Sequence, residues 1–242
     1  MNIVMPMAGR GSRFAAIGID TPKPLIPVRG KPMYAWAMDS LPLELAKRVV
    51  FICLEEHLAG RGLESDINTR YRALDPTIIP LRQVTEGQAC TVLEAREHID
   101  SPEPLCIYNA DTYSRSRLGE LLRRLGPSVD GVIDVFRAPG DKWSFARVDA
   151  SGRVTETAEK RRISEWATTG LYYFSRGEDF VRHTDGMIRD DVRVNGEFYV
   201  APVYNRMIGE GADVRANEVD EVWVLGTPED LEHFEAEYPV SA

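Results

Sequence analysis

The chain has 242 residues, 43% of them hydrophobic and 28% charged, which is enough for one substantial core that buries roughly 70% of the unfolded chain's surface. Its 38 acidic and 29 basic residues give a formal net charge of −9, which argues against general binding to nucleic acids and to anionic membranes. No apolar run of about 18 or more residues suggests a membrane-spanning segment.

The cysteines and histidines do not predict a metal centre. The three cysteines are widely spaced and form no Cys-x-x-Cys pair, and the four histidines are scattered, so we expect no structural zinc site. The spacing fits reduced, buried thiols. No secretory leader pattern precedes the first predicted strand, so we expect a cytoplasmic protein.

Strand and helix patterns alternate along the first half of the chain. Short apolar runs typical of buried strands occupy residues 2–7, 48–54, 77–84 and 104–111. Helical patterns occupy residues 32–41, 57–73, 88–99 and 118–125. This alternation predicts a parallel sheet with helices on both faces.

The pattern changes after a further predicted strand at residues 130–138. Two short alternating segments flank the turn Ala150-Ser-Gly152 and predict a β-hairpin over residues 145–157. The later elements that we expect are a strand at 167–174, a helix at 196–208, a strand at 221–225 and a last helix that Thr227 caps.

A glycine-rich loop follows the first predicted strand. It runs from Ala8 to Phe14 as Ala-Gly-Arg-Gly-Ser-Arg-Phe, and Pro22-Lys-Pro-Leu25 follows it. Glycines let the backbone approach a ligand closely, and successive N–H groups form a nest for anions. Two arginines and a lysine add positive charge, so this segment predicts a phosphate site.

The loop differs from two common phosphate-binding motifs. It lacks the spacing Gly-x-x-x-x-Gly-Lys-Ser/Thr, and Phe14 stands where the dinucleotide fingerprint has its third glycine. Gly9-x-Gly11-x-Arg13-Phe14, followed by Pro22-Lys23, instead resembles the signature of the sugar-nucleotidyltransferase (nucleotide-sugar pyrophosphorylase) family. The resemblance implies a three-layer Rossmann-like α/β fold with a mostly parallel central sheet and a small β-rich acceptor subdomain.

The resemblance extends from residue 2 to about residue 234. It implies a single nucleotidyltransferase domain over residues 1–242. Within it, we expect a nucleotide-binding half at 1–138, an acceptor-binding half at 139–217, and a closing strand and helix at 218–242.

The resemblance also implies which residues bind the nucleotide. The triphosphate and the leaving pyrophosphate would contact the loop and the Arg13 side chain, while Lys23 would stabilise charge on the α-phosphate. The loop residues implied are Met7, Ala8, Gly9, Arg10, Gly11 and Ser12. Gly87 and Gln88 begin a predicted helix, where free N–H groups lie. From the residues alone, Gln88 fits helix capping and base recognition equally well; the resemblance favours the base.

Asp111 ends a predicted buried strand. Ligands of open α/β sheets bind at the carboxyl ends of strands, and Mg²⁺ prefers one or two carboxylates together with phosphates and water. An aspartate here also fits a cap for the next helix, but its occurrence with a phosphate loop favours a metal. The resemblance implies the same metal-binding role for Asp111.

The second metal ligand departs from the family pattern. Many members carry an aspartate just before the Gly-Thr that is Gly226-Thr227 here, and this chain has Val224 and Leu225 instead. We expect Asp220, the nearest preceding aspartate, to replace it. The alternatives are Glu218 and Glu221.

The acceptor site is implied by two later segments. Glu159 and Lys160 precede a Thr-Gly-Leu-Tyr strand, as in the family, where the acid contacts acceptor hydroxyls and the lysine the acceptor phosphate. Such charged runs are otherwise typically solvated. Gly170 would let the backbone pass close to the ligand. Glu197 would be a further acceptor contact, although it fits a helix-entry acid nearly as well.

The resemblance implies a Mg²⁺-dependent nucleotidyltransferase whose partners are a nucleoside triphosphate and a phosphorylated acceptor. A sugar 1-phosphate is the expected acceptor. The alternative is a cytidylyltransferase acting on phosphocholine or a phosphonate, because aromatic residues of the acceptor half fit either sugar stacking or a quaternary ammonium cage, or simply the core. A glycosyltransferase, which usually carries Asp-x-Asp where this chain has Asn109-Ala-Asp111, and a non-catalytic nucleotide-binding protein are the remaining alternatives.

Overall fold

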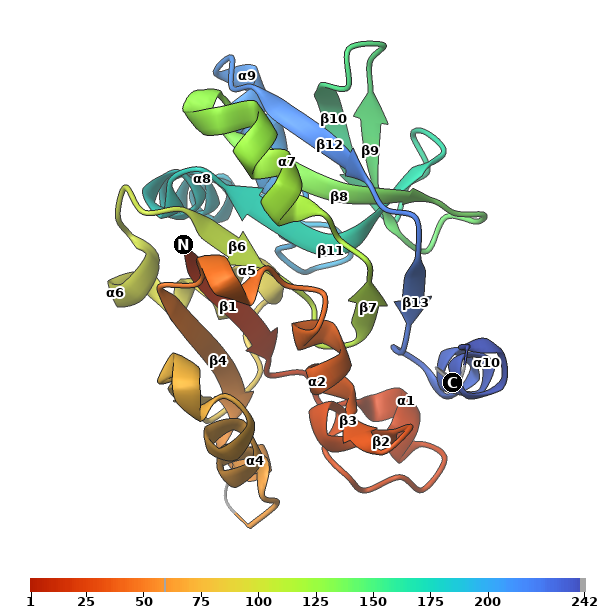
Figure 1. Ribbon diagram of the computed structural model, residues 1–242. Helices are drawn as coiled ribbons and strands as arrows, with labels where there is room; N and C mark the ends of the chain where they lie inside the picture. The colour runs from red at the N-terminus through yellow and green to blue at the C-terminus, as the bar shows by residue number, and fades with distance from the viewer. Residues whose placement is uncertain (59, 240–242) are drawn as a thin grey trace.

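A nine-stranded sheet forms the centre of the computed structural model, which describes residues 1–58 and 60–239 (Figure 1). Its parallel half has the spatial order β6-β1-β4-β5. These strands are β1 (Asn2–Met7), β4 (Arg48–Leu54), β5 (Thr77–Leu81) and β6 (Leu105–Ile107). The predictions for residues 2–7 and 48–54 are confirmed at both ends, because strands buried on both faces have continuous apolar sequences.

The other half of the sheet is largely antiparallel. Its centre is β11 (Trp166–Phe174), which pairs antiparallel with β6, β8 and β9. The remaining strands of this half are β8 (Gly131–Arg137), β9 (Ser144–Val148), β10 (Val154–Glu159) and β12 (Val214–Glu218). The predicted hairpin is the pair β9-β10. Because β11 pairs with β6, one sheet runs through both halves of the chain.

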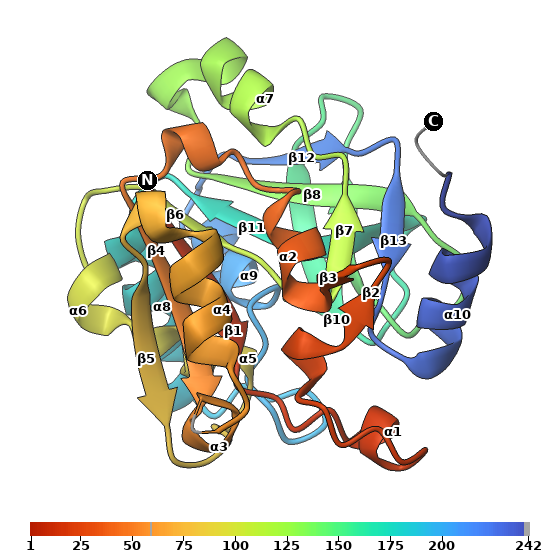
Figure 2. The same cartoon turned by 60° about the horizontal axis from the view of Figure 1, so that its bottom comes forward.

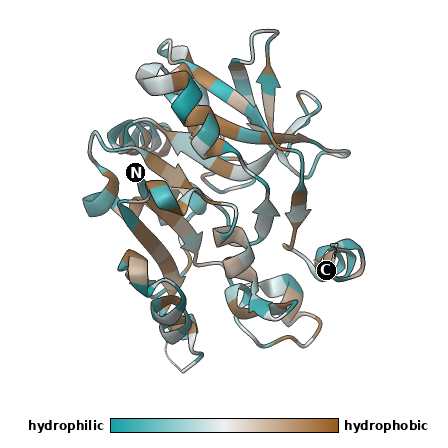
Figure 3. Cartoon of the chain, viewed as in Figure 1, coloured by the Kyte–Doolittle hydropathy of each residue, from teal (hydrophilic) through white to brown (hydrophobic). Residues whose placement is uncertain are grey.

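Helices cover both faces of the sheet, as predicted. Alternate residues of β1 point to opposite faces: Val4 packs in a core with α5, α8 and α9, whereas Ile3 and Met5 pack in a second core with α2, α4 and α7. Figure 3 shows hydrophobic residues concentrated along β1 and β4. The helices are α1 (Ser12–Ala15), α2 (Met33–Met38), α3 (Glu55–Leu58), α4 (Leu63–Arg70), α5 (Gln88–Leu93), α6 (Arg96–Ile99), α7 (Leu118–Leu125), α8 (Gly177–Arg189), α9 (Val203–Gly209) and α10 (Pro228–Glu237).

Several predicted boundaries were wrong for local backbone reasons. The helix predicted at 57–73 is divided into α3 and α4, and Gly60 and Gly62 between them have φ of 74° and 81°. The helix predicted from residue 196 begins only at Val203, because Asn195 and Gly196 form a turn with positive φ. Helix α8 and strand β12 were not predicted from the sequence.

The chain's last segment returns to its first 40 residues. Strand β13 (Val222–Val224) pairs with β7 (Thr112–Ser114) outside the main sheet, and α10 follows it (Figure 2). Phe234 of α10 is fully buried in a third core with Phe14 and Trp36, beside the small hairpin β2 (Pro27–Val28) and β3 (Lys31–Pro32). This packing brings the start of α10 close to the glycine-rich loop. Within the described residues, no helix has the length and apolarity needed to cross a membrane.

Candidate active site

A pocket of about 450 Å³ opens at the carboxyl ends of β1 and β6. Strand β1 lies between β4 and β6, so the chain's connections run to opposite sides at this point of the parallel sheet. Open α/β sheets bind ligands at such a switch point. The pocket extends from the glycine-rich loop, past the end of β6, to β9, β10 and β11 of the acceptor half.

The loop places only part of its predicted residues in this pocket. Met7, Gly9 and Arg13 line it. Ala8 is buried, Ser12 is exposed at the start of α1, and two loop residues, Arg10 and Gly11, line a separate pocket of about 210 Å³ on the other side.

Gly11 has a structural role at the base of this loop. Its φ is 64°, and a Cβ there would lie 2.9 Å from Cβ of Lys23. The glycine thus lets the loop pack directly against the lysine that lines the pocket.

Lys23 and Asp111 meet inside the pocket. Lys23 begins a short 3-10 helix (Lys23–Leu25), Asp111 follows β6, and the Lys23 Nζ lies 2.5 Å from the Asp111 Oδ2. Both side chains are partly exposed, at 22% and 29%. The two residues for which the sequence predicts phosphate and metal roles therefore lie side by side.

The structure does not bring Asp220 to this pocket. The Asp220 side chain is 72% exposed, and its Oδ2 accepts a hydrogen bond of 2.7 Å from Arg117. The alternatives also lie outside the pocket lining, where Glu218 pairs with Arg137 and Glu221 pairs with Arg115. Strand β13 carries the chain from these acids back to the pocket, so nearness in sequence to Gly226 did not mean nearness in space.

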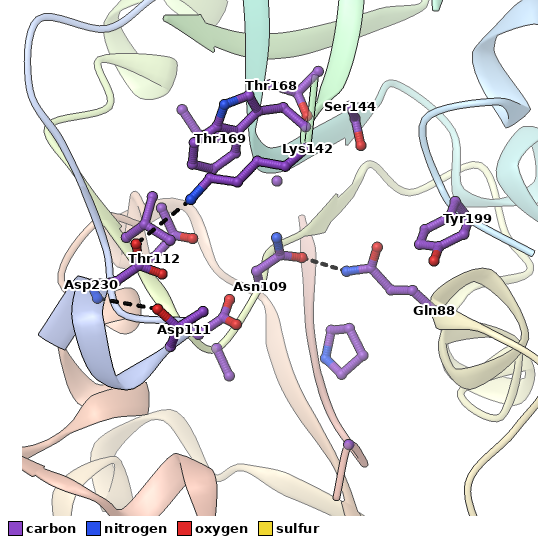
Figure 4. Close-up of a pocket in the computed structure, with 18 of the residues that line it drawn as sticks. Gln88, Asn109, Asp111, Thr112, Lys142, Ser144, Thr168, Thr169, Tyr199 and Asp230 are labelled. Carbon is purple, nitrogen blue, oxygen red and sulfur yellow. Dashed lines mark hydrogen bonds and ion pairs between the residues drawn. The ribbon is translucent and has the colours of Figure 1, made fainter. Parts of the chain in front are cut away.

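Asp230 is the acid that lines the pocket on this side. It belongs to the first turn of α10, and its backbone N–H donates to the Thr227 Oγ1 over 3.1 Å. Thr227 therefore caps α10, as predicted. The Asp230 carboxylate faces the pocket (Figure 4). Val224, one of the two residues that stand before Gly226, also lines the pocket.

Gln88 faces the pocket instead of capping α5. The N-cap is Gly87, without a side-chain hydrogen bond, and the Gln88 Nε2 donates to the Asn109 Oδ1 over 2.5 Å. Gly87 does not line the pocket. Its φ is 134°, and a Cβ there would lie 2.4 Å from the carbonyl oxygen of Phe198.

Phe198 joins this turn to the acceptor half. Its N–H donates to the Glu86 carbonyl over 2.8 Å, and its carbonyl accepts from the Ala89 N–H over 3.0 Å. A salt bridge of 2.5 Å between Arg193 and Glu86 lies beside these bonds. We call these three contacts the 86–198 seam.

Glu159 is the buried acid at the acceptor end. Its side chain lines the pocket with 8% of the residue exposed, and it accepts a hydrogen bond from the Ser144 hydroxyl. Burial raises the pKa of its carboxyl above the ordinary value, against the effects of that hydrogen bond and of the nearby Lys160 charge. A buried, hydrogen-bonded carboxyl of this kind suits contacts with hydroxyl groups.

The other predicted acceptor residues are divided. Gly170 lines the pocket, and its φ of 91° together with a Cβ position only 2.0 Å from the Asn109 Nδ2 requires a glycine. Lys160 is exposed, and its Nζ donates to the Tyr199 hydroxyl over 2.5 Å. Glu197 is exposed outside the lining; burial and a hydrogen bond to Glu197 raise the Tyr199 pKa. Tyr199 itself lines the pocket.

Further polar and charged lining residues were not predicted as site residues. Asn109 and Thr169 belong to segments where Asp111 and Gly170 received the predicted roles. Lys142 has no local sequence signal, because its position depends on the loop between β8 and β9. These lining residues include Asn109, Lys142, Ser144, Thr168, Thr169 and Asp230.

Comparison with known proteins confirms the resemblance. The family model for nucleotidyl transferase matches residues 2–191. The bifunctional protein GlmU of Cupriavidus pinatubonensis is 27% identical over 98% of this chain and 51% of its own length. UTP–glucose-1-phosphate uridylyltransferase AglF of Haloferax volcanii is 26% identical over 97% of this chain and 95% of its own. This chain therefore spans about half the length of the GlmU relatives and nearly all of AglF.

Solved structures agree in fold. The nucleoside-diphosphate-sugar pyrophosphorylase from Vibrio cholerae RC9 is 27% identical and superposes with a TM-score of 0.84, covering 97% of this chain and 100% of that one. A putative glucose-1-phosphate thymidylyltransferase from Bacillus anthracis, 17% identical, covers 100% of this chain and 98% of that one with a TM-score of 0.77, which shows the fold alone. The chain therefore belongs to the nucleotidyl transferase family.

Proposed function

We propose that the protein is a Mg²⁺-dependent nucleotidyltransferase that joins a nucleoside triphosphate to a sugar 1-phosphate and releases pyrophosphate. The observation that carries the proposal is the contact of Lys23 with Asp111 in a pocket at the sheet's switch point. A metal-bound triphosphate needs a positively charged group and a carboxylate. Here the Lys23 ammonium of the signature segment and the Asp111 carboxylate at the strand end supply them.

The reaction needs positioning and charge neutralisation more than proton transfer. An acceptor phosphate oxygen, already anionic at neutral pH, attacks the α-phosphorus, and the bond to the β-phosphate oxygen breaks as pyrophosphate leaves. In this proposal Lys23 neutralises charge on the α-phosphate and Arg13 binds the leaving pyrophosphate. The backbone around Gly9 approaches the phosphates closely, because that residue has no side chain and lines the pocket.

The pocket fits a divalent cation. Asp111 offers a carboxylate at the end of β6, and a Cβ on Gly226 would lie 3.2 Å from its Oδ2, so the absence of a side chain at Gly226 keeps this space free. In the part of the chain that is described, no three His, Cys, Asp or Glu side chains form a metal-binding group. This donor set suits Mg²⁺, which takes one or two carboxylates and completes its coordination with phosphates and water. When bound, the cation would be held by Asp111 and would offset phosphate charge.

We assign the two substrates to the two ends of the pocket. Gln88 and Asn109 present amide groups that both donate and accept, which suits the edge of a base. At the other end, Glu159, Thr168 and Ser144 present the oxygen groups that suit sugar hydroxyls. A phosphorylated amino alcohol is the second candidate acceptor, because Trp143 and Tyr172 line the pocket with the buried Glu159 and these groups also suit a cationic head.

The test is a panel assay of pyrophosphate release with Mg²⁺. CTP, UTP, dTTP, GTP and ATP are each combined with sugar 1-phosphates, phosphocholine and simple phosphonates. We expect one base and one acceptor to give turnover far above all other pairs, with a sugar 1-phosphate as that acceptor. Turnover with phosphocholine alone would replace the acceptor assignment. Binding of nucleotide in a thermal shift assay without turnover on any pair would contradict the enzymatic proposal.

A further inference from the structure

Two carboxylates face one space beside Gly226. A Cβ built on this glycine would lie 3.2 Å from the Asp111 Oδ2 and 3.8 Å from the Asp230 Oδ2. The two oxygens are therefore no more than 7.0 Å apart. They come from different parts of the fold, the end of β6 and the first turn of α10.

The helix start fixes where Asp230 points. Its backbone N–H is used by the Thr227 cap, and Pro228 occupies the first helical position. The same helix is anchored by Phe234, which packs edge-on against Trp36 with ring centroids 4.9 Å apart. The Thr227 side chain, and not the Asp230 carboxylate, caps α10. The packing of this helix holds the carboxylate at the pocket.

Each of the two carboxylates has its own lysine. Asp111 contacts Lys23 at 2.5 Å, and Asp230 lies 3.8 Å from the Nζ of Lys142, which reaches across the pocket from the loop between β8 and β9 (Figure 4). Lys142 is 63% exposed, whereas Asp230 is 20% exposed. The site thus contains two carboxylates, and each of them is paired with one ammonium group.

We propose that Asp230 is the second carboxylate of the divalent-cation site, in place of the aspartate that many family members carry just before the Gly-Thr, and that Lys142 is its exchangeable counter-ion. The inference rests on the proposed function, because it concerns the cation of that reaction. Mg²⁺ keeps several of its waters in proteins, so a carboxylate within 7.0 Å of Asp111 is close enough to share the hydrated ion. Lys142 then becomes available to the phosphates that enter with the metal.

The first test measures binding of Mn²⁺ alone to the full chain, by the loss of the free-ion signal in electron paramagnetic resonance. Asp230→Asn should weaken Mn²⁺ binding about tenfold, the scale of losing a supporting ligand, while Asp230→Glu retains it. The matched control is Asp220→Asn, which removes an exposed acid that pairs with Arg117 outside the pocket and should leave binding unchanged. Equal affinity of Asp230→Asn and the wild type, or no Mn²⁺ binding by the wild type, would overturn the proposal.

Lys142 gives a readout of opposite sign. Lys142→Met removes the competing counter-ion and should tighten Mn²⁺ binding severalfold, which a merely structural role of the ion pair would not do. Unchanged or weaker binding would contradict the counter-ion role, even where Asp230→Asn folds poorly. The panel assay separates this inference from the proposed function. If the wild type is active and Asp230→Asn binds the metal normally, only the metal-ligand role of Asp230 is wrong. If the wild type is inactive but binds Mn²⁺ through Asp230, the proposed reaction is wrong.

Discussion

The contact between Lys23 and Asp111 joins residues that are 88 positions apart in the sequence. Both side chains remain partly exposed in the pocket. Ion pairs at this level of exposure contribute about 1 kcal/mol or less to folding. We therefore expect loss of the Lys23–Asp111 ion pair to reduce substrate binding and turnover strongly and to reduce the free energy of unfolding only slightly.

Replacing Lys23 by Met should separate these two effects. The substitution keeps the length of the side chain and removes its charge, so we expect pyrophosphate release to fall about 100- to 1,000-fold, as when one charge-stabilising donor is lost, with a melting temperature close to the wild-type value. Lys47→Met is the control, because Lys47 is 64% exposed and pairs with Glu103 away from the pocket. Turnover within tenfold of wild type in Lys23→Met would rule out its catalytic role.

Gly170 tests the close approach of two strands at the pocket. Gly170→Ala places a Cβ 2.0 Å from the Asn109 Nδ2 at a φ of 91°. Gly140→Ala is the matched control, with a φ of 77° and nothing within 4 Å of its Cβ. Both variants carry the cost of a positive φ, about 1 kcal/mol, so we expect urea unfolding to show a clearly larger loss for Gly170→Ala. Equal losses would mean that Asn109 simply moves aside.

At the scale of elements, the pairing of β8 with β12 contains a buried acid. Asp134 lies directly opposite Asn217 in the parallel register and is fully buried. The Asn217 Nδ2 donates to the Asp134 Oδ1 over 2.7 Å, but the Oδ2 has no hydrogen-bond partner in the described residues. Burial raises the pKa of this carboxyl to about 6, against the effects of the nearby Ser116 hydroxyl and of Asn217, which lower it.

This acid predicts a pH dependence of stability. Because the pKa is higher in the folded chain than the 3.8 of an ordinary aspartate, the folded state binds more protons between these values. The free energy of unfolding should therefore fall as pH rises from about 4 to above 6, by about 3 kcal/mol from this group. Asp134→Asn should remove this dependence, which urea unfolding at pH 4 and pH 8 would measure. If the free energy of unfolding differs between the wild type and Asp134→Asn by the same amount at pH 4 and pH 8, that result would contradict the burial of an ionisable Asp134.

At the scale of the whole molecule, elements with a clear local pattern were predicted best. Residues 2–7 and 48–54 were predicted at both ends, because burial on both faces leaves a continuous apolar sequence, and the helix at 118–125 was also predicted at both ends. Helix α8 and strand β12 were not predicted. Helix α8 contains Gly186, where a Cβ would lie 2.7 Å from the Arg206 guanidinium of α9. Local helix propensity does not register such a contact between helices.

The site shows the same difference between local and distant information. The glycine loop, Lys23 and Asp111 follow from short motifs, and four of these residues, Gly9, Arg13, Lys23 and Asp111, line the pocket. Asp220 was predicted from its position before Gly226, but it lies outside the pocket lining, and Asp230, which lines the pocket, was not among the predicted metal ligands. Asp230 lies at the pocket because Phe234 of α10 packs against Phe14 and Trp36 near the start of the chain. No local sequence pattern predicts that contact.

The two halves should unfold together. One sheet continues across them through the pairing of β11 with β6. We therefore expect coincident transitions for tryptophan fluorescence, which reports on all four tryptophans, and for far-ultraviolet circular dichroism in urea. They are Trp36, Trp143, Trp166 and Trp223. Two separated transitions would show that the acceptor half is an independent domain.

The 86–198 seam limits how this chain could acquire a new acceptor during evolution. It ties the turn before Gln88 to the segment that presents Tyr199, through backbone bonds of 2.8 and 3.0 Å that no side-chain substitution removes. An insertion or deletion in residues 193–199 would therefore also displace Gln88, which we assign to the base. In the proposed enzyme, acceptor preference would then change by substitution at positions such as Trp143 and Ser144, while the length of the chain at the seam stays constant.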